Sequence, residues 1–411
     1  MKQGYLSQYF YGVAMKHLSA VETDLKLSHQ HEFNGVKGLK SLLGEPEQKT
    51  QFNATFLYMD DENDNPLVEE GFLTWYDSRQ KARNERSIMR WEYRLYFSDN
   101  LVTRNAGSGD FLVIAKQSDQ TLLAIVAKKD TTIEKQLMWL FDFHENDESG
   151  FSVKSGTEYD NEQVGIAARV VLEYLGIEVE EDAPGFLEQM ISIFHGGFPK
   201  AFEFSEFARG TLHDVSGLDD PDAALIAWME QEEVLFRTLE KHLLLQKLQE
   251  ISRLGIEDPE PVIKVVQSAL QRRKSRAGSA LENHLEYIFI QHGLTYTRGG
   301  VTENNVKPDF IFPDISCYHN REFPTERLTM LASKSTCKDR WRQILNEAER
   351  IPYKHLLTLE PSISMNQTNE MDSMKVQLVL PKVLHRTYSL SQQARLINLS
   401  AFLDLARQRQ Q

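Results

Sequence analysis

The period of the hydrophobic pattern changes along the chain, and this change limits the folds that it can adopt. Between Phe52 and Phe143 the apolar residues form short runs of strand type, separated by turn-forming stretches such as Asp60–Pro66 and Asn105–Gly109. The runs are FNATFLYM, GFLTWYDS, WEYRLYFS, GDFLVIAKQ, TLLAIVAKK and QLMWLFDF. Runs of this kind at short spacing predict an antiparallel barrel or sandwich.

One of these runs indicates which side chains its strand would bury. In Trp91, Tyr93, Leu95 and Phe97, a period of two places four large side chains on one face. The same period leaves Arg94 on the opposite face. We therefore expect the four side chains to be buried together.

The second part of the chain mixes helical and strand patterns. Ala223–Leu254 has apolar residues at helical spacing, and a later helix that follows an Arg-rich stretch is stopped by Gly293. Strand-like apolar runs and a last amphipathic helix follow, at 310–312, 328–332, 355–359, 375–381 and Ser391–Ala406. Strands mingled with helices predict an α/β domain.

The boundary between the two parts is marked by composition. A chain of 411 residues exceeds one typical domain, and the stretch VEEDAPG at 179 to 185 combines charge with Pro and Gly, as a hinge does. We expect an N-terminal β domain at 1–180, a hinge linker at 181–189 and a C-terminal α/β domain at 190–411. The first domain would also contain helical segments at Val36–Leu43 and Gln163–Leu175.

The net charge of −14 argues against general adhesion to nucleic acid, because phosphate contacts depend on Lys and Arg. Basic residues nevertheless gather in segment 78–90, SRQKARNERSIMR, and in 272–276. The first segment is either a solvated charged loop or a DNA-reading arm, since Arg, Lys, Asn and Glu can all pair with base edges. The residues assigned to DNA contact here are Lys81, Arg83, Asn84, Glu85 and Arg86, with His29 and Gln30 from a second arm at 28–37.

The two cysteines, Cys317 and Cys337, form no CxxC pair, so neither a zinc site nor a disulfide framework is indicated. No window approaches 18 uninterrupted apolar residues. These patterns predict a cytoplasmic protein without a membrane span.

The stretch from Pro308 to Glu347 carries the residues of a metal-dependent nuclease. Asp309 begins one apolar run, Lys334 ends another, and Glu347 lies on the amphipathic, helix-like segment that follows. Two carboxylates can hold a hard divalent cation, and a lysine can steady the attacking oxygen and the phosphoryl group. Nucleases of the PD-(D/E)xK type have a carboxylate two residues before the lysine, where this chain has Ala332, so Glu347 would supply it.

Three longer stretches resemble EcoRII-type (type IIE) restriction endonucleases of the PD-(D/E)xK superfamily. They are RRKSRAGxxLExHLExxFIxHGL at 272–294, KPDFxFP at 307–313 and KxTCKDRWRQILNEA at 334–348. The resemblance covers about 190–411. The N-terminal half is more faintly similar, at Lys81–Trp91 and Gly35–Leu43, to the family's DNA-binding effector domain, an all-β pseudobarrel. The C-terminal domain would then have the restriction-endonuclease-like α/β fold.

The resemblance implies roles for individual residues. Asp309, Lys334 and Glu347 would be catalytic with Mg²⁺, which Asp309 and Glu347 would bind together with an accessory Glu282. Tyr318 matches a tyrosine near the active site, although packing is an alternative role for it. Lys338, Asp339 and Arg340 would read C:G pairs, Gln271 and Lys274 would contact DNA nearby, and Trp228 and Glu232 stand where the family has its base-flipping pocket.

The implied activity is cleavage of double-stranded DNA at a CCNGG-like sequence, such as CCWGG, by a homodimer. Metal-activated water would leave a 5′-phosphate, and the N-terminal domain would bind a second copy of the site and control cleavage allosterically. A cognate DNA methyltransferase would belong to the same restriction-modification system. Two other functions fit the residues: a DNA-binding regulator with an inactive nuclease domain, and a nuclease acting at lesions or mismatches.

Overall fold

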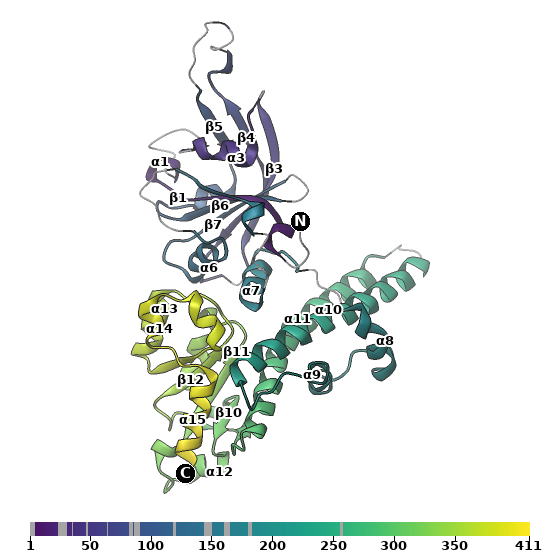
Figure 1. Cartoon of the computed structure of the whole chain (residues 1–411), viewed down its shortest axis with the longest axis vertical. Coiled ribbons are helices and arrows are strands. Elements are labelled where there is room, and N and C mark those ends of the chain that lie inside the picture. The colour runs from purple at the N-terminus through teal and green to yellow at the C-terminus, as the bar shows by residue number, and fades with distance from the viewer. Residues whose placement is uncertain are drawn as a thin grey trace. The chain divides into compact units, whose positions relative to one another are not determined.

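The computed structural model describes residues 5–23, 31–34, 36–46, 48–63, 65–81, 85, 91–117, 121–143, 150–159, 165–179, 183–254 and 258–411, apart from the side chains of 254 and 338–340 (Figure 1). The chain divides into two compact units. One is Met1–Val179 with Ser362–Gln367, and the other is Glu180–Pro361 with Thr368–Gln411. No helix in the described ranges is long and apolar enough to cross a lipid bilayer.

The first unit is built on a sheet with the strand order β2-β5-β4-β3-β7-β6-β1-β8. Its strands are β1 (Phe10–His17), β2 (Glu32–Phe33), β3 (Thr50–Met59), β4 (Leu67–Asp77), β5 (Tyr93–Phe97), β6 (Phe111–Gln117), β7 (Leu122–Ala127) and β8 (Ser152–Ser155). Its helices are η1 (Leu6–Gln8), α1 (Ala20–Thr23), η2 (Val36–Leu39), α3 (Lys40–Leu43), α5 (Leu101–Asn105), α6 (Thr132–Leu140), η3 (Gly156–Tyr159) and α7 (Ile166–Tyr174).

Pairing within this sheet is not purely antiparallel, which corrects the prediction. Strands β3 and β7 are parallel, with Ala54 opposite Leu122 and Met59 opposite Ala127. A parallel pair requires a long crossover connection, and β4, β5, α5 and β6 supply it here. The apolar runs in the sequence indicate where strands form, but they do not indicate whether neighbouring strands run parallel or antiparallel.

Both faces of the centre of this sheet are buried. Along β6, Phe111 and Val113 pack into one apolar core, whereas Leu112 and Ile114 pack into the other. Helices α6 and α7 contribute to the first core, and η2 with α3 contributes to the second. Burial on both faces explains why β6 and β7 are continuously apolar in sequence.

Three local predictions for this unit need correction. The run QLMWLFDF at 136–143 is not a strand, because Thr131 accepts a hydrogen bond from Glu134 N and starts the helix α6. The side chain of Trp91 is 51% exposed, since it precedes β5, while Leu95 and Phe97 are buried as expected. Strand β1 lies between β6 and β8 but was not among the predicted strands.

The second unit combines two long helices with a mixed sheet of order β13-β12-β11-β10-β9. Its helices are α8 (Pro184–Ile193), α9 (Ala201–Gly210), α10 (Pro221–Leu254), α11 (Glu260–Gln291), η4 (Glu303–Asn305), α12 (Ile315–His319), η5 (Thr325–Arg327), η6 (Lys338–Asn346), η7 (Lys382–Thr387), α14 (Leu390–Gln393) and α15 (Leu399–Gln410), and α13 (Met365–Ser373) begins at the edge of the first unit. Its strands are β9 (Thr297–Arg298), β10 (Phe310–Phe312), β11 (Thr329–Lys334), β12 (Lys354–Thr358) and β13 (Val376–Val379).

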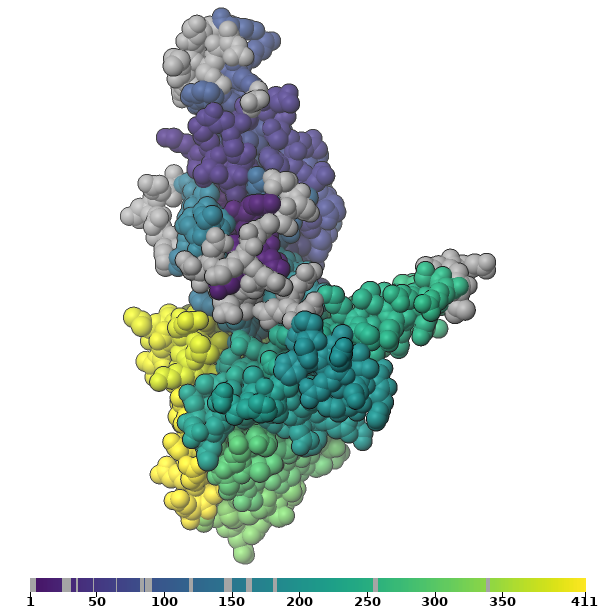
Figure 2. Space-filling model, turned by 45° about the vertical axis from the view of Figure 1, so that its right-hand side comes forward, coloured from purple at the N-terminus to yellow at the C-terminus, as the bar shows by residue number. Residues whose placement is uncertain are grey.

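The sheet of the second unit packs on α11 and α15. Phe289 of α11 contacts Phe310 and Phe312 edge to face, with ring centroids 5.0 and 5.2 Å apart. Phe402 of α15 lies 5.8 Å from Phe312. Strands β9, β10 and β11 are antiparallel, and β11, β12 and β13 are parallel, as in the predicted α/β class. The far ends of α10 and α11 project beyond the rest of this unit (Figure 2).

The structure corrects three predicted segments in this unit. Pro184 opens the helix α8, so the predicted hinge at 181–189 is helical from residue 184. The segment after Lys338 is a 3₁₀ helix that ends at Asn346, and Glu347 follows it with extended backbone angles. The last predicted helix is two helices, because Ile397 between them forms a parallel bridge to Val379.

Candidate active site

Asp309 and Lys334 are brought together by neighbouring strands. Asp309 precedes β10, and the antiparallel pairing of Phe310 with Leu331 places it beside the end of β11. Its Oδ2 accepts hydrogen bonds from Lys334 Nζ at 3.0 Å and from Ser333 N at 2.7 Å. The ion pair is only partly exposed, at 25% for the lysine and 17% for the aspartate side chain.

Glu347 belongs to the same electrostatic environment. Burial, followed by the negative charge of Asp309, raises the pKa of the Glu347 carboxyl to about 7, although Lys334 and Lys354 oppose the shift. Its Oε2 is buried and has no hydrogen-bond partner among the described residues. A buried carboxylate oxygen without a donor is costly unless a cation or water satisfies it.

The position two residues before Lys334 offers no carboxylate. Ala332 is fully buried in β11, and its methyl side chain has no oxygen to offer a metal ion. A carboxylate that replaces the one absent at Ala332 has to lie near Asp309, and the effect of the Asp309 charge on the pKa of Glu347 agrees with this position. The structure thus brings together Asp309, Lys334 and Glu347, although Glu347 lies just beyond a 3₁₀ helix.

Glu282 also responds to the charge of Asp309, but it has an arginine partner. Burial and Asp309 raise the pKa of Glu282, while Arg298 lowers it. Glu282 Oε2 accepts from Arg298 Nη2 at 2.8 Å and from Nε at 3.2 Å, and Arg298 Nη1 also binds Glu286 at 2.7 Å. Glu282 therefore borders the site, with one oxygen already engaged.

Tyr318 has the packing role that the sequence left as its alternative. Its side chain is 3% exposed, and its hydroxyl donates to Glu303 Oε2 at 2.5 Å. The hydroxyl oxygen of Tyr318 in turn accepts a hydrogen bond from Arg350 N at 3.3 Å. Burial and the bond to Glu303 raise the pKa of Tyr318. These contacts direct the hydroxyl to Glu303, as a packing role requires, and the assignment to catalysis stays a prediction.

The residues present fit a hard divalent cation. Among the described residues no three His, Cys, Asp or Glu side chains form a group that would hold a metal ion alone. Mg²⁺ commonly uses only one or two carboxylates, with water and substrate phosphate completing its shell. Asp309 and the unpartnered Oε2 of Glu347 supply this smaller set.

The predicted base-reading residues are only partly described. Lys338, Asp339 and Arg340 form the start of η6, and their side chains lie outside the described structure. The bond from Cys337 N to Glu360 Oε2, 2.9 Å long, holds this end of η6. Gln271 and Lys274 are exposed on α11, the helix that also carries Glu282.

In the first unit, only two of the residues assigned to DNA contact, Lys81 and Glu85, are among the described residues. Lys81 and Glu85 are exposed and lie 4.0 Å apart as a weak ion pair. The other predicted contact residues of both arms, Arg83, Asn84, Arg86, His29 and Gln30, lie outside the described residues.

The two residues assigned to a base-flipping pocket, Trp228 and Glu232, are buried, and their assignment stays a prediction. Trp228 is 2% exposed, and its ring lies 5.8 Å from that of His284. Glu232 is fully buried, with its Oε2 3.0 Å from His284 Nε2. Arg209 donates to His284 Nδ1 at 3.0 Å, so the proton of the neutral imidazole lies on Nε2, on the side of Glu232. Both side chains thus serve the packing of α10 on α11.

A cavity of about 200 Å³ lies on another face of the same two helices. Its wall combines phenylalanine rings with arginine and serine side chains, among them Phe198, Phe236, Arg272, Arg276 and Ser279. The guanidinium of Arg272 lies 3.9 Å from the centre of the Phe198 ring, and that of Arg276 lies 4.3 Å from Phe236. Phe236 is itself only 3% exposed, and both rings are covered by these guanidinium groups.

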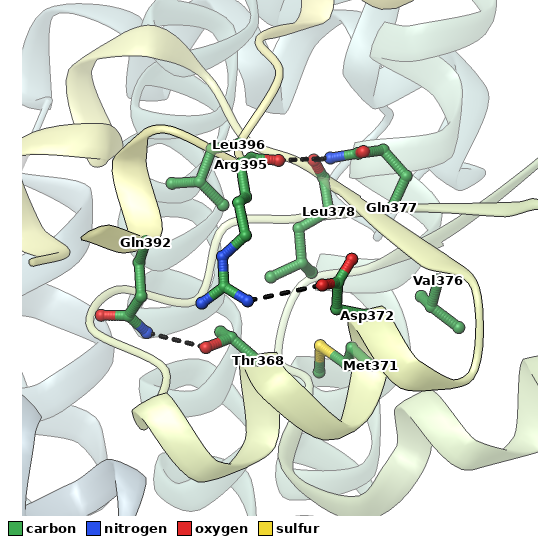
Figure 3. Close-up of a pocket in the computed structure, with 9 residues that line it drawn as sticks. All are labelled: Thr368, Met371, Asp372, Val376, Gln377, Leu378, Gln392, Arg395 and Leu396. Carbon is green, nitrogen blue, oxygen red and sulfur yellow. Dashed lines mark hydrogen bonds and ion pairs between the residues drawn. The ribbon is translucent and has the colours of Figure 1, made fainter. Parts of the chain in front are cut away.

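Figure 3 shows a smaller hollow beside β13, α13 and α14. Its volume of about 30 Å³ is close to that of one water molecule. Polar bonds close it, including Gln392 Nε2 to Thr368 Oγ1 at 3.0 Å and Arg395 Nη1 to Asp372 Oδ2 at 3.5 Å. It contains none of the candidate residues and is too small for a nucleotide.

Two residues of the site escaped the sequence-based prediction. Arg298 binds Glu282, and Lys354 lies under the turn that carries Glu347. The only signal for Lys354 was a lysine at the start of an apolar strand, and for Arg298 a basic residue before two glycines. Neither pattern identifies a partner that is distant in sequence.

Comparisons with known proteins place this chain among restriction enzymes. The family described as EcoRII C terminal matches residues 236–403. The type II restriction enzyme EcoRII of Escherichia coli is 32% identical over 399 residues, covering 96% of this chain and 93% of that protein. Among solved structures, metal-depleted Ecl18kI in complex with uncleaved DNA is 20% identical, with a TM-score of 0.44, over 56% of this chain and 85% of that one. A complex of restriction endonuclease PspGI with substrate DNA is 17% identical, with a TM-score of 0.44, over 52% and 93%.

Proposed function

Because the chain belongs to the family of the type II restriction enzyme EcoRII and is a type II site-specific nuclease, we propose that it cuts double-stranded DNA at a CCNGG-like site such as CCWGG. Mg²⁺ would be held by Asp309 and Glu347. The observation that carries the proposal is the Asp309–Lys334 ion pair beside a buried, unpartnered oxygen of Glu347. A divalent cation held with Asp309 would satisfy that oxygen.

The residues of the site divide the chemistry between them. Bound Mg²⁺ would lower the pKa of water and neutralise charge on the phosphate. Asp309 fixes the Lys334 ammonium at 3.0 Å, so that it can also donate to the attacking water and to the phosphoryl oxygen. Glu282, held by Arg298, adds a negative charge that helps to retain the cation. The product would carry a 5′-phosphate.

Recognition would come from the segment between Lys334 and Glu347. Lys338 and Arg340 can donate to guanine, and Asp339 can accept from cytosine. Since the same short segment leads directly to Glu347, correct base contacts would place the catalytic carboxylate. Gln271 and Lys274 on α11 would contact the same duplex from another side.

The cavity lined by Phe198, Phe236, Arg272 and Arg276 is a second candidate for the base-flipping pocket, beside the predicted Glu232, which Arg276 contacts. A flipped base is held by stacking between aromatic or apolar side chains and by hydrogen bonds to its edge. The cavity offers both kinds of contact, since Ser275 and Ser279 also line it. Trp228 and Glu232 would support it from within the helix pair.

The N-terminal unit would act as a DNA-binding effector domain. Lys81 and Glu85 are exposed there, and the basic segment that contains them suits contact with a second copy of the site. Occupation of that copy would release cleavage by the second unit, in a homodimer whose two subunits each cut one strand. A cognate methyltransferase would protect the host DNA.

Replacing Asp309 by alanine tests the assignment. Mg²⁺-dependent cleavage of a plasmid that carries the site should fall by at least 100-fold, while binding of the duplex is retained. Asp404→Asn, at an exposed carboxylate of α15, is the matched control and should cut normally. Unchanged cutting by Asp309→Ala would overturn the proposal. Specific binding by the unaltered chain without any cutting would instead favour a DNA-binding regulator.

A further inference from the structure

Lys354 is a buried lysine directly beneath the candidate active site. It is the first residue of β12 and is 5% exposed. Its Nζ donates to three backbone carbonyls, those of Glu347, Ala348 and Ile351, the last two at 3.0 Å. The three bonds would use all three hydrogens of the ammonium form, and burial lowers the pKa of this group.

This arrangement differs from that of a lysine buried for an ion pair. Lys16, the other buried lysine in the described part of the chain, binds the Glu22 carboxylate at 2.8 Å. Lys354 forms no ion pair with a carboxylate among the described residues, and its three acceptors are carbonyls of one turn. Burying a charge is costly, and carbonyl bonds offset that cost only when the carbonyls are held in place.

The turn depends on this support because it is not part of a regular element. Glu347 ends η6 with φ −89° and ψ 140°, and Ala348 has a φ of +46°, which is uncommon for alanine. Within the turn, Ile351 N donates to Ala348 O at 2.8 Å, and Ala348 N reaches Thr302 Oγ1 at 3.4 Å. Glu349 N and Arg350 N also donate to Glu303 Oε2 and to the Tyr318 hydroxyl, each at 3.3 Å, but Lys354 is the group that joins the carbonyls of Glu347, Ala348 and Ile351.

We propose that Lys354 is a positioning residue for Glu347, whose backbone turn it holds so that the carboxylate faces Asp309. The inference rests on the proposed role of Glu347 as a metal ligand. In this chain the carboxylate that is absent at Ala332 has moved to an irregular segment. Lys354 gives that segment the fixed position that a strand would otherwise provide, because β12 pairs with β11, the strand of Lys334.

The test measures binding of Mn²⁺ to the full chain, from free Mn²⁺ in electron paramagnetic resonance spectra, which is independent of cleavage. Lys354→Met should weaken Mn²⁺ binding on the order of 10-fold to 100-fold, as loss of a group that orients a metal ligand does. The Mg²⁺ concentration for half-maximal cleavage should rise similarly. Lys354→Gln, which keeps two donors, should have a smaller effect and serves if the methionine variant does not fold.

Two comparisons separate positioning from general destabilisation. Leu403→Ala removes core packing under α15 and should lower the melting temperature without changing the Mn²⁺ affinity. Glu347→Ala should weaken Mn²⁺ binding, and the double variant Glu347→Ala/Lys354→Met should be no weaker, because Lys354 acts through Glu347. Further weakening in the double variant would overturn the inference.

The remaining outcomes distinguish this inference from the proposed function. If Glu347→Ala weakens Mn²⁺ binding while both Lys354 variants bind normally, Lys354 does not position the ligand and only this inference fails. If Glu347→Ala itself binds Mn²⁺ normally, the metal-ligand role of Glu347 is wrong and both proposals fail.

Discussion

Asp309 and Glu347 are carboxylates of one site with different surroundings. Asp309 Oδ2 has two close donors, Lys334 Nζ and Ser333 N. The buried Oε2 of Glu347 has none among the described residues, and burial together with the charge of Asp309 raises the pKa of Glu347 to about 7. A cation bound at both residues would remove the cause of that shift, so the metal-free protein should show a distinct dependence on pH.

In the metal-free protein, Glu347→Gln should increase stability at alkaline pH. The carboxyl ionises near its ordinary pKa of 4.5 when unfolded and near 7 when folded. The folded state therefore binds more protons between these values, and stability falls as pH rises from about 4.5 to 7. At pH 8 the variant should be more stable by about 3 kcal/mol, the equivalent of this shift, and at pH 4 no such gain should appear. Calorimetric unfolding at both pH values checks this, with the exposed Glu349→Gln as a control.

Asp309, Lys334 and Glu347 could be proposed from the sequence because charged residues at the ends of apolar runs are conspicuous, and their roles stay predictions. It could not show that Trp228 and Glu232 are buried. The charge of Glu232 is met by Arg276, 44 residues away, and by His284. These partners are distant in sequence. A polar residue beside apolar residues on a helix therefore gives the same sequence pattern whether it belongs to a buried polar network or to a binding pocket.

At the level of elements, the nine-residue η6 begins with the proposed base-reading residues and leads to Glu347, the proposed metal ligand. Its hydrophobic positions predicted an amphipathic helix, and the buried face is present, with Trp341 and Ile344 fully buried. Its 3₁₀ form and its end at Asn346 could not be predicted, because tertiary contacts such as Cys337 N to Glu360 Oε2 fix the path of the segment. The type of α6 could not be predicted either, because a short apolar run of residues is compatible with a strand or with a helix.

The buried side chain of Trp341 should fix the position of η6 on the rest of the second unit. Trp341→Ala should cost about 3–5 kcal/mol, as for other buried aromatic residues, and should reduce the preference for the cognate site over unrelated DNA because Lys338–Arg340 lose their support. Trp341→Phe should retain most of that preference. Binding to both duplexes is compared with Phe402→Ala, a fully buried aromatic of α15. Equal loss of preference in Phe402→Ala would show that destabilisation alone explains the effect.

For the whole molecule, the division into two units agrees with the change of hydrophobic period in the sequence. The assignment of Ser362–Gln367 to the first unit was not predictable, because these residues are separated from it along the chain by the catalytic segments. The predicted hinge is shortened by the helix α8, which begins at Pro184. Control of cleavage by a second DNA site must therefore be tested in the full chain.

Lys81→Ala should separate effector binding from catalysis. Lys81 is 87% exposed, and its ion pair with Glu85 is long, at 4.0 Å, so its removal should hardly change stability. Cleavage of a plasmid with one site should be stimulated by an added duplex carrying the same site in the unaltered protein. In Lys81→Ala, about 5-fold to 150-fold more duplex should be needed, because loss of a base contact weakens binding by about 1–3 kcal/mol. The cleavage rate at saturating duplex should be unchanged.

Lys128 is an exposed lysine of the same unit that pairs with Glu62, and Lys128→Ala is the control, which should respond like the unaltered chain. Equal duplex requirements in all three proteins would exclude Lys81 from the effector site.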